Sequence, residues 1–166
     1  DLICLIIHLL MIIIILFQIN HYIIFLIIFR ILIKMKEFDW PIRIYYEDTD
    51  AGGVVYHARY LAFYERARTE MLRQSNIQQQ TLLEQARIAF VVKNMNINYL
   101  LPARLDDLLI VRSQVVSVRK ASLTFKQQII DEVNRVYNEA EVLIACVDLN
   151  KNKPCVFPKL FISEFL

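Results

Sequence analysis

The chain has 166 residues, a length that indicates one domain of ordinary size. Apolar residues make up 57% of it and charged residues 22%, which is enough for a packed core and argues against a disordered chain. The formal net charge of +2 gives no support for nucleic-acid binding, which usually requires a concentrated basic patch.

The first segment, residues 1–34, differs sharply in composition from the rest. It contains fourteen isoleucines and no Ala, Gly, Ser, Thr or Val. Its apolar stretch is long enough to span a bilayer, and the basic residues that follow it would then leave the remaining chain in the cytoplasm. A cleaved signal peptide is disfavoured, because no cleavage site of small residues is present.

A third origin for residues 1–34 is translation of AT-rich DNA upstream of a true start, and this is the explanation that we favour. Natural membrane helices usually contain Ala, Gly, Ser and Val, whereas Met35 begins a stretch of ordinary composition. We therefore expect a hydrophobic extension at 1–34, either an artefact or a membrane anchor, and a folded domain at 35–166. The domain is expected in the cytoplasm, at the inner membrane only if the extension is genuine.

The folded part begins with a predicted strand, an acidic loop and a long helix. Alternation predicts the strand at 41–46, and the loop follows at 47–53. The helix is predicted at 58–73, where large apolar residues recur every three or four positions and form one face. These residues are Tyr60, Phe63, Tyr64, Ala67 and Met71.

Four further strands are predicted after the helix, in meander-like succession, at 90–101, 108–119, 122–130 and 136–149. One long helix with an antiparallel sheet makes an α+β domain, in which the helix can bury its apolar face only against the sheet. A single sheet leaves its edges available to a second copy, so we expect an oligomer.

The acidic loop is the densest cluster of groups that could carry chemistry. Glu47, Asp48 and Asp50 precede the chain's only two glycines, and the helix follows at once. The start of a helix offers unpaired backbone N–H groups that can polarise a carbonyl oxygen. A nearby carboxylate could attack that carbonyl or activate water, which suits acyl transfer to water. Aspartate also caps helices commonly, so the spacing alone leaves a structural role open.

Two long stretches show a family resemblance. The runs YYEDTDAGGVVYHARYLAFYERARTEMLR and FVVKNMNINYLLPARLDD, with the later NEAEVLIACVD, resemble the tol-pal system-associated acyl-CoA thioesterases (YbgC type) of the 4-hydroxybenzoyl-CoA thioesterase branch. The resemblance covers residues 38–161, and residues 1–34 have no counterpart in the family. It implies a hotdog fold, an antiparallel sheet wrapped around one long helix, and hydrolysis of short-chain or aromatic acyl-CoA thioesters.

The resemblance also implies roles for individual residues. Asp50 would be the catalytic carboxylate, as nucleophile or as base for water, and His57 would help from the helix start through its N–H or its imidazole. Asp48 would shape the loop, and Glu65 could reach the site from one helical turn inward. The expected substrate-binding residues are Gly53, Val54, Val55, Tyr56 and Tyr60.

The expected partners follow from the same resemblance. The protein would act as a homodimer or homotetramer on acyl-CoA, and acyl carrier protein is a further candidate partner. Arg119 and Lys120 are candidates to contact the CoA nucleotide. A non-catalytic module that binds acyl-CoA or acyl carrier protein at the bacterial envelope remains the alternative.

No cofactor is expected, because the sequence has neither a Gly-rich phosphate loop nor a metal-ligand cluster. The three cysteines, Cys4, Cys146 and Cys155, match no zinc spacing, and an odd number argues against a disulfide framework. We expect reduced thiols, as is usual in the cytoplasm.

Overall fold

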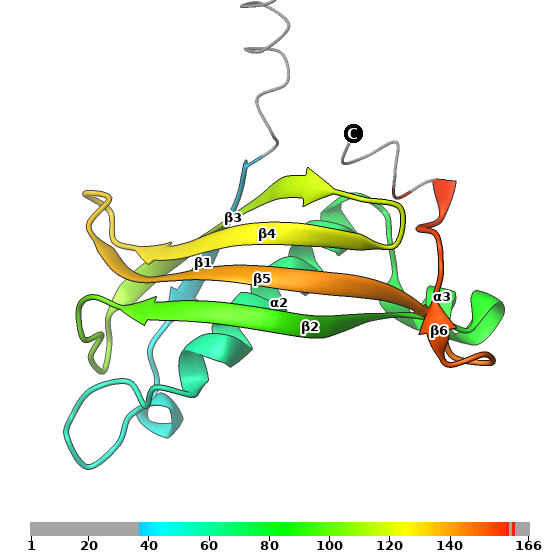
Figure 1. The fold of residues 1–166 in the computed structure, drawn as a ribbon. Helices are drawn as coiled ribbons and strands as arrows, with labels where there is room; N and C mark the ends of the chain where they lie inside the picture. Colours follow the sequence, from blue (N-terminus) through cyan, green and yellow to red (C-terminus); the bar gives the residue numbers. More distant parts are fainter. Residues whose placement is uncertain (1–36, 160, 162–166) are drawn as a thin grey trace, which may run out of the picture. The chain divides into compact units, whose positions relative to one another are not determined.

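The computed structural model describes residues 37–159 and 161 (Figure 1). The predicted extension at 1–34 therefore lies outside the described residues. The elements in chain order are β1 (Glu37–Arg43), the 3-10 turn η1 (Tyr46–Asp48), α2 (Arg59–Gln74), α3 (Gln79–Ala86), β2 (Ile88–Tyr99), β3 (Leu108–Val118), β4 (Ser122–Ile130), β5 (Val136–Asp148) and β6 (Lys153–Pro154).

The strands form one antiparallel sheet in the order β1-β3-β4-β5-β2, and β6 pairs with the end of β5. The predicted meander is correct for β3, β4 and β5. It is wrong for β2, which pairs with β5 at the far edge instead of with β3. Alternation sets which face a residue occupies but not which strand is its neighbour, so this crossover could not be derived from the pattern.

Helix α2 lies against one face of the sheet, as predicted (Figure 1). All five residues of its predicted apolar face are buried. From the sheet they meet the inward residues of β4 and β5, which alternate with less buried residues on the opposite face. The inward set includes Leu123, Phe125, Val142, Ile144 and Cys146.

The end of α2 has a local sequence cause. Asn76 takes φ 58°, the left-handed conformation that asparagine tolerates better than most residues. The N–H of Ile77 then bonds to the carbonyl of Leu72 at 2.9 Å, and the N–H of Asn76 bonds to that of Arg73 at 2.9 Å. This Schellman arrangement satisfies carbonyls that the helix leaves unpaired.

Several boundaries differ from the predictions. Strand β1 begins before the predicted 41–46 and includes Pro41, which β1 tolerates because it is an edge strand paired only with β3. Helix α3 was not predicted; it has no buried residue and therefore lacks a strong apolar period. Strand β6 was not predicted either, since two residues carry no periodic signal.

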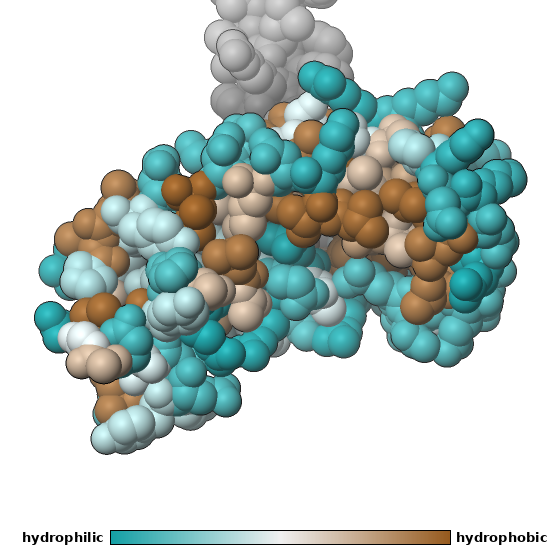
Figure 2. All heavy atoms as spheres, turned by 60° about the horizontal axis from the view of Figure 1, so that its bottom comes forward, coloured by the Kyte–Doolittle hydropathy of each residue, from teal (hydrophilic) through white to brown (hydrophobic). Residues whose placement is uncertain are grey.

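The two edges of the sheet differ in character. Strand β2 forms one edge, and Val91 and Val92 expose 40% and 52% of their surface there. Figure 2 shows apolar side chains gathered in a band across the face of the molecule that comes forward from the bottom of Figure 1, where β2 lies. An apolar strand with an unpaired edge is an unusual surface for a chain that acts alone.

Candidate active site

The segment between β1 and α2 folds as a narrow hairpin-like loop. The N–H of Tyr56 donates to the carbonyl of Asp48 at 2.9 Å, and the N–H of Asp50 donates to that of Val54 at 3.0 Å. At the tip Gly53 has φ +71° and donates its N–H to the carbonyl of Asp50 at 2.9 Å. A side chain at this φ would be strained, which explains a glycine here. The loop thus has a defined shape, and it projects at the lower left of Figure 1.

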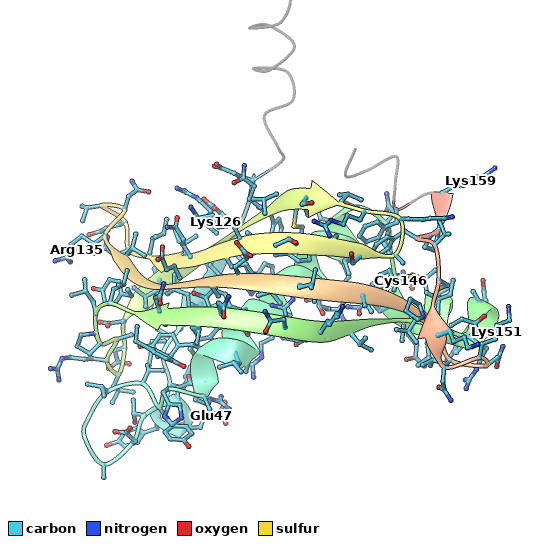
Figure 3. The ribbon with its side chains drawn as sticks, in the orientation of Figure 1. Glu47, Lys126, Arg135, Cys146, Lys151 and Lys159 are labelled. Atoms are coloured by element: carbon cyan, nitrogen blue, oxygen red, sulfur yellow. The ribbon has the colours of Figure 1, made fainter. Side chains whose placement is uncertain are left out.

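Asp48 fastens the base of this loop. Its side chain is buried, and its Oδ1 accepts hydrogen bonds from Arg59 Nε at 2.7 Å and Nη2 at 2.5 Å. Its Oδ2 accepts from the N–H of Tyr45 at 2.9 Å. The bond to Asp48 is the main reason why the pKa of Arg59 is raised. At the surface Glu47, labelled in Figure 3, also pairs with Arg59 at 3.1 Å.

The Asp48–Arg59 pair agrees with the loop-shaping role expected for Asp48. Its partner was not predicted, because an arginine eleven residues later on an exposed helix face gives no sequence signal. The pair joins the loop directly to the first residue of α2. A partly buried, charge-assisted contact therefore holds the acidic loop against the start of the helix.

Asp50 lies on the hairpin with its side chain exposed in the single chain. Its Oδ1 accepts a hydrogen bond from the N–H of Gly52 at 2.7 Å. Its Oδ2 has no hydrogen-bond partner among the described residues. One carboxylate oxygen is thus oriented by the loop backbone, and the other is available to a substrate or a water molecule.

The position of Gly52 predicts that a side chain at this residue would displace the Asp50 carboxylate. A Cβ added there would lie 3.0 Å from Asp50 Oδ1, closer than ordinary van der Waals contact. We expect Gly52→Ala to rotate the exposed Asp50 carboxylate and, with the catalytic role that the resemblance implies for Asp50, to lower kcat about tenfold, in line with the sensitivity of catalysis to small misplacements. The melting temperature should barely change, because the group that yields is a flexible side chain at the surface.

Steady-state kinetics and a thermal melt on Gly52→Ala would check this. The neighbouring Ala51→Ser provides a control, because Ala51 is exposed at the same loop. An unchanged kcat in Gly52→Ala would show that the orientation of Asp50 does not matter for turnover.

The start of α2 carries no side-chain cap. Ala58 stands at the N-cap position and has no side chain that could accept a hydrogen bond. Among the described residues, the N–H groups of His57 and Ala58 have no acceptor. These donors point from the positive end of the helix, so the site can hold a developing negative charge on an oxygen.

His57 is held mainly through its backbone and its ring face. Its carbonyl accepts a hydrogen bond from the Tyr99 hydroxyl at 3.1 Å. Its ring packs beside Tyr56, with centroids 4.4 Å apart, and edge-on to Tyr99 at 6.4 Å. Its imidazole nitrogens make no hydrogen bond to any described residue. Tyr99 was not predicted as part of this region; it comes from β2, some forty residues later.

The expected substrate-binding residues divide into two groups. Gly53 and Tyr56 are exposed and Val54 is half-buried, so these three can reach a ligand. Val55 and Tyr60 are buried in the core. The Val55 N–H donates to the carbonyl of Ala103 at 2.9 Å, and the Tyr60 hydroxyl accepts from the Ala103 N–H at 3.2 Å. Burial weighs against direct substrate contact by Val55 and Tyr60; they brace the loop against the segment before β3.

Other residues considered from the sequence lie elsewhere. Glu65 is exposed on α2, accepts a hydrogen bond from Thr69 Oγ1 at 2.8 Å, and lines a cavity of about 80 Å³ between α2 and the sheet. Arg119 and Lys120 lie at the β3–β4 turn, at the opposite end of β3 from the acidic loop. Within one chain they are not brought to Asp50.

The cavity beside Glu65 contains a buried arginine that sequence reasoning missed. Arg68 Nη1 donates to Gln127 Oε1 at 2.8 Å, and burial lowers the pKa of Arg68 to about 10. Gln127 Nε2 donates in turn to Ser113 Oγ at 2.7 Å and to the carbonyl of Tyr64 at 3.2 Å. The sequence signal that could have indicated this buried polar network is Gln127, a glutamine at an inward position of β4. The network fastens α2 to β3 and β4.

The described residues contain no group of three His, Cys, Asp or Glu side chains that could hold a metal ion. Within residues 37–159 no helix has the length and apolar character needed to cross a bilayer.

Comparison with known proteins decides the family. The family model for the thioesterase-like superfamily matches residues 45–165. The acyl-CoA thioester hydrolase YbgC of Escherichia coli O6:H1 is 56% identical over 128 residues, which cover 77% of this chain and 95% of that protein. The chain belongs to the thioesterase-like superfamily.

Two further relatives agree with this assignment. The acyl-CoA thioesterase YbgC of Haemophilus influenzae is also 56% identical, over 74% of this chain and 89% of its own length. The crystal structure of a probable thioesterase from Bartonella henselae is 35% identical, with a TM-score of 0.70 over 74% of this chain and all of that one. The expected hotdog fold and acyl-CoA thioesterase activity are therefore confirmed, and acyl-CoA is the substrate class of this member of the superfamily.

Proposed function

We propose that this acyl-CoA thioesterase hydrolyses its substrate with Asp50 as the catalytic carboxylate and with the start of α2 as the group that holds the thioester oxygen. The observation that supports this most is the presence of two complementary features on one loop, whose shape is set by backbone hydrogen bonds. Asp50 has a carboxylate oxygen without a partner, and the N–H groups of His57 and Ala58 lack acceptors among the described residues. The Asp48–Arg59 contact joins the two features.

Two routes balance for this arrangement. In one, an Asp50 oxygen attacks the thioester carbon, the C–S bond breaks, CoA leaves as thiolate and takes a proton, and water then cleaves the resulting anhydride. In the other, Asp50 takes a proton from a water molecule that attacks the same carbon, the C–S bond breaks, and CoA leaves as thiolate and receives that proton. In both, negative charge grows on the carbonyl oxygen, which the N–H groups at the start of α2 stabilise. His57 then contributes chiefly through its backbone, although its exposed imidazole is free to assist.

A second copy of the chain is part of the proposal. Asp50 is open to solvent in the single chain, and the apolar residues Val91 and Val92 lie on the free edge of β2. Pairing of β2 with a second β2 would cover this edge. We propose a homodimer or homotetramer.

Light scattering at micromolar concentration should give at least twice the mass of one chain. Val92→Lys, which places a charge on the free edge, should shift the protein toward the monomer and lower activity. A fully active monomer would contradict the proposal.

We propose that the acyl-CoA substrates carry small acyl groups, short-chain or aromatic. We expect purified protein to cleave such thioesters with the highest kcat/KM in a panel that also contains long-chain acyl-CoA and acyl carrier protein thioesters, with released thiol as the readout. Fastest cleavage of long chains would overturn the size preference, and cleavage of the carrier protein would establish it as a partner. Binding without any turnover would favour the non-catalytic module instead.

The cellular setting is proposed on the family resemblance alone. We propose a cytoplasmic protein that acts with the tol-pal system at the inner face of the bacterial envelope. Fractionation of cells followed by detection of the protein would test the compartment, and recovery in the periplasm would contradict it.

A further inference from the structure

Two cysteines face one another where the C-terminal segment returns to the sheet. Cys146 lies on β5, and Cys155 follows the two-residue strand β6. Their Sγ atoms are 3.4 Å apart, and both residues are free thiols. Figure 3 labels Cys146 at the end of β5 where β6 joins it. The thioesterase site makes no use of either residue.

The backbone places the two residues directly opposite each other. Strands β5 and β6 pair Asp148 with Lys153 and Val147 with Pro154, so Cys146 and Cys155 are next in register. The N–H of Cys155 donates to the carbonyl of Cys146 at 2.9 Å. Opposed residues of antiparallel strands have Cα atoms about 4.5–5.5 Å apart, within the range that a disulfide spans. The sulfurs can close the remaining distance by side-chain rotation.

We propose that Cys146 and Cys155 are a thiol oxidation site that forms an intramolecular disulfide when the protein meets a peroxide. Cys155 is half-buried, whereas Cys146 is fully buried. The half-buried Cys155 is therefore the first to react.

The chemistry balances with one equivalent of peroxide. The Cys155 sulfur attacks a peroxide oxygen, the O–O bond breaks, one water leaves, and Cys155 becomes a sulfenic acid. The Cys146 sulfur then attacks the Cys155 sulfur, the S–O bond breaks, and the departing hydroxide takes the Cys146 proton as a second water. Two thiols and one peroxide thus give one disulfide and two waters.

The buried position of Cys146 protects it from direct oxidation. Desolvation by burial and the hydrogen bond with Cys155 raise the pKa of Cys146 to about 12. Because the thiolate is the reactive form of cysteine, Cys146 stays an unreactive thiol in the reduced protein. It acts only as the resolving residue, when the hydroxide that leaves the Cys155 sulfenic acid takes its proton.

The disulfide would add a covalent link to a segment that packs on the sheet without one. After β6 the chain is held by aromatic packing: Phe157 and Phe161 stack with centroids 4.5 Å apart, and Phe90 of β2 meets both. Phe90 and Phe161 also line the cavity that contains Arg68. Oxidation would therefore clamp one wall of that cavity and stabilise the fold, without touching Asp50.

Peptide mapping of the full chain tests the proposal. The reduced protein is treated with excess hydrogen peroxide, alkylated, and digested. We expect Cys146 and Cys155 in one linked pair of peptides, and in a Cys4→Ser background an intact mass about 2 Da lower with no alkylation. The melting temperature should rise by about 5 °C and return after dithiothreitol.

Cys155→Ser in the same background is the matched control. It should keep Cys146 alkylatable after peroxide, with no loss of mass and no rise in melting temperature. Three results would overturn the proposal: both thiols still alkylatable after oxidation, Cys155 carried to sulfinic acid beside an intact Cys146, or a disulfide that joins two chains.

Discussion

Asp50→Asn should lower kcat for acyl-CoA hydrolysis by at least ~10²-fold, a typical loss for a general acid–base group, with a larger loss if Asp50 is the nucleophile. Asparagine keeps the shape of the side chain and an oxygen that can accept the N–H of Gly52, which now bonds to Asp50 Oδ1 at 2.7 Å. It lacks the negative charge and basicity that either route needs. Because the side chain is exposed, the melting temperature should stay within a degree or two.

Glu47→Gln is the matched control for this variant. Glu47 is an exposed carboxylate on the same loop and pairs with Arg59 at the surface, where an ion pair contributes little. Its kcat should stay within about twofold of the starting protein, because the substituted group touches no proposed reacting atom. Steady-state kinetics of thioester cleavage by both variants tests whether the loss of kcat is specific to Asp50. Asp50→Asn with undiminished kcat would exclude Asp50 as the catalytic carboxylate.

His57→Ala separates the two roles considered for His57. If the residue acts through its backbone N–H, the substitution removes only the ring and its contacts with Tyr56 and Tyr99, and kcat should fall less than about tenfold. If the imidazole transfers a proton, the loss should approach that of Asp50→Asn, and the pH dependence of kcat should differ between His57→Ala and the starting protein. A full pH profile on both proteins distinguishes the two.

Much of the fold could be predicted because its signals are periodic. The apolar face of α2 follows from a spacing of three to four residues, and its five predicted residues are buried. The alternate residues of β4 and β5 that face α2 are buried as well, as a spacing of two implies. The position of β2 in the sheet could not be predicted from such a spacing. It pairs with β5 after a crossover, and nothing in the alternation of Met95, Ile97 and Tyr99 states which strand lies beside it.

In the candidate site too, features that are close in the sequence could be predicted, whereas contacts between residues distant in the sequence could not. The acidic loop, its glycines and the helix start are contiguous in the chain, so their proximity follows from the sequence. The contacts that hold them do not, since Arg59 reaches back eleven residues to Asp48 and Tyr99 arrives from β2. Val55 and Tyr60 were expected at the substrate from the family resemblance; in the single chain both are buried, and both form hydrogen bonds with Ala103, a residue from the segment before β3.

Arg59→Met should destabilise the fold by about 2–4 kcal/mol, a large share of the 5–15 kcal/mol typical of a domain. The reason is the carboxylate left behind: Asp48 exposes 1% of its surface, and it would keep only the Tyr45 N–H as a partner. A buried charge without its counter-ion costs far more than the intact pair contributes. Activity should also fall, because the pair holds the loop of Asp50 to the start of α2.

Arg112→Met gives a matched control with the same type of contact at the surface. Arg112 binds Asp39 through Nε at 2.9 Å and Nη2 at 2.8 Å, but the two side chains expose 34% and 43% of their surface. Its loss should therefore cost about 1 kcal/mol or less. Urea unfolding of the two variants compares them directly, and equal losses would contradict the argument from burial. The double variant Asp48→Asn with Arg59→Met should regain part of the lost stability, because it removes the stranded charge as well as its partner.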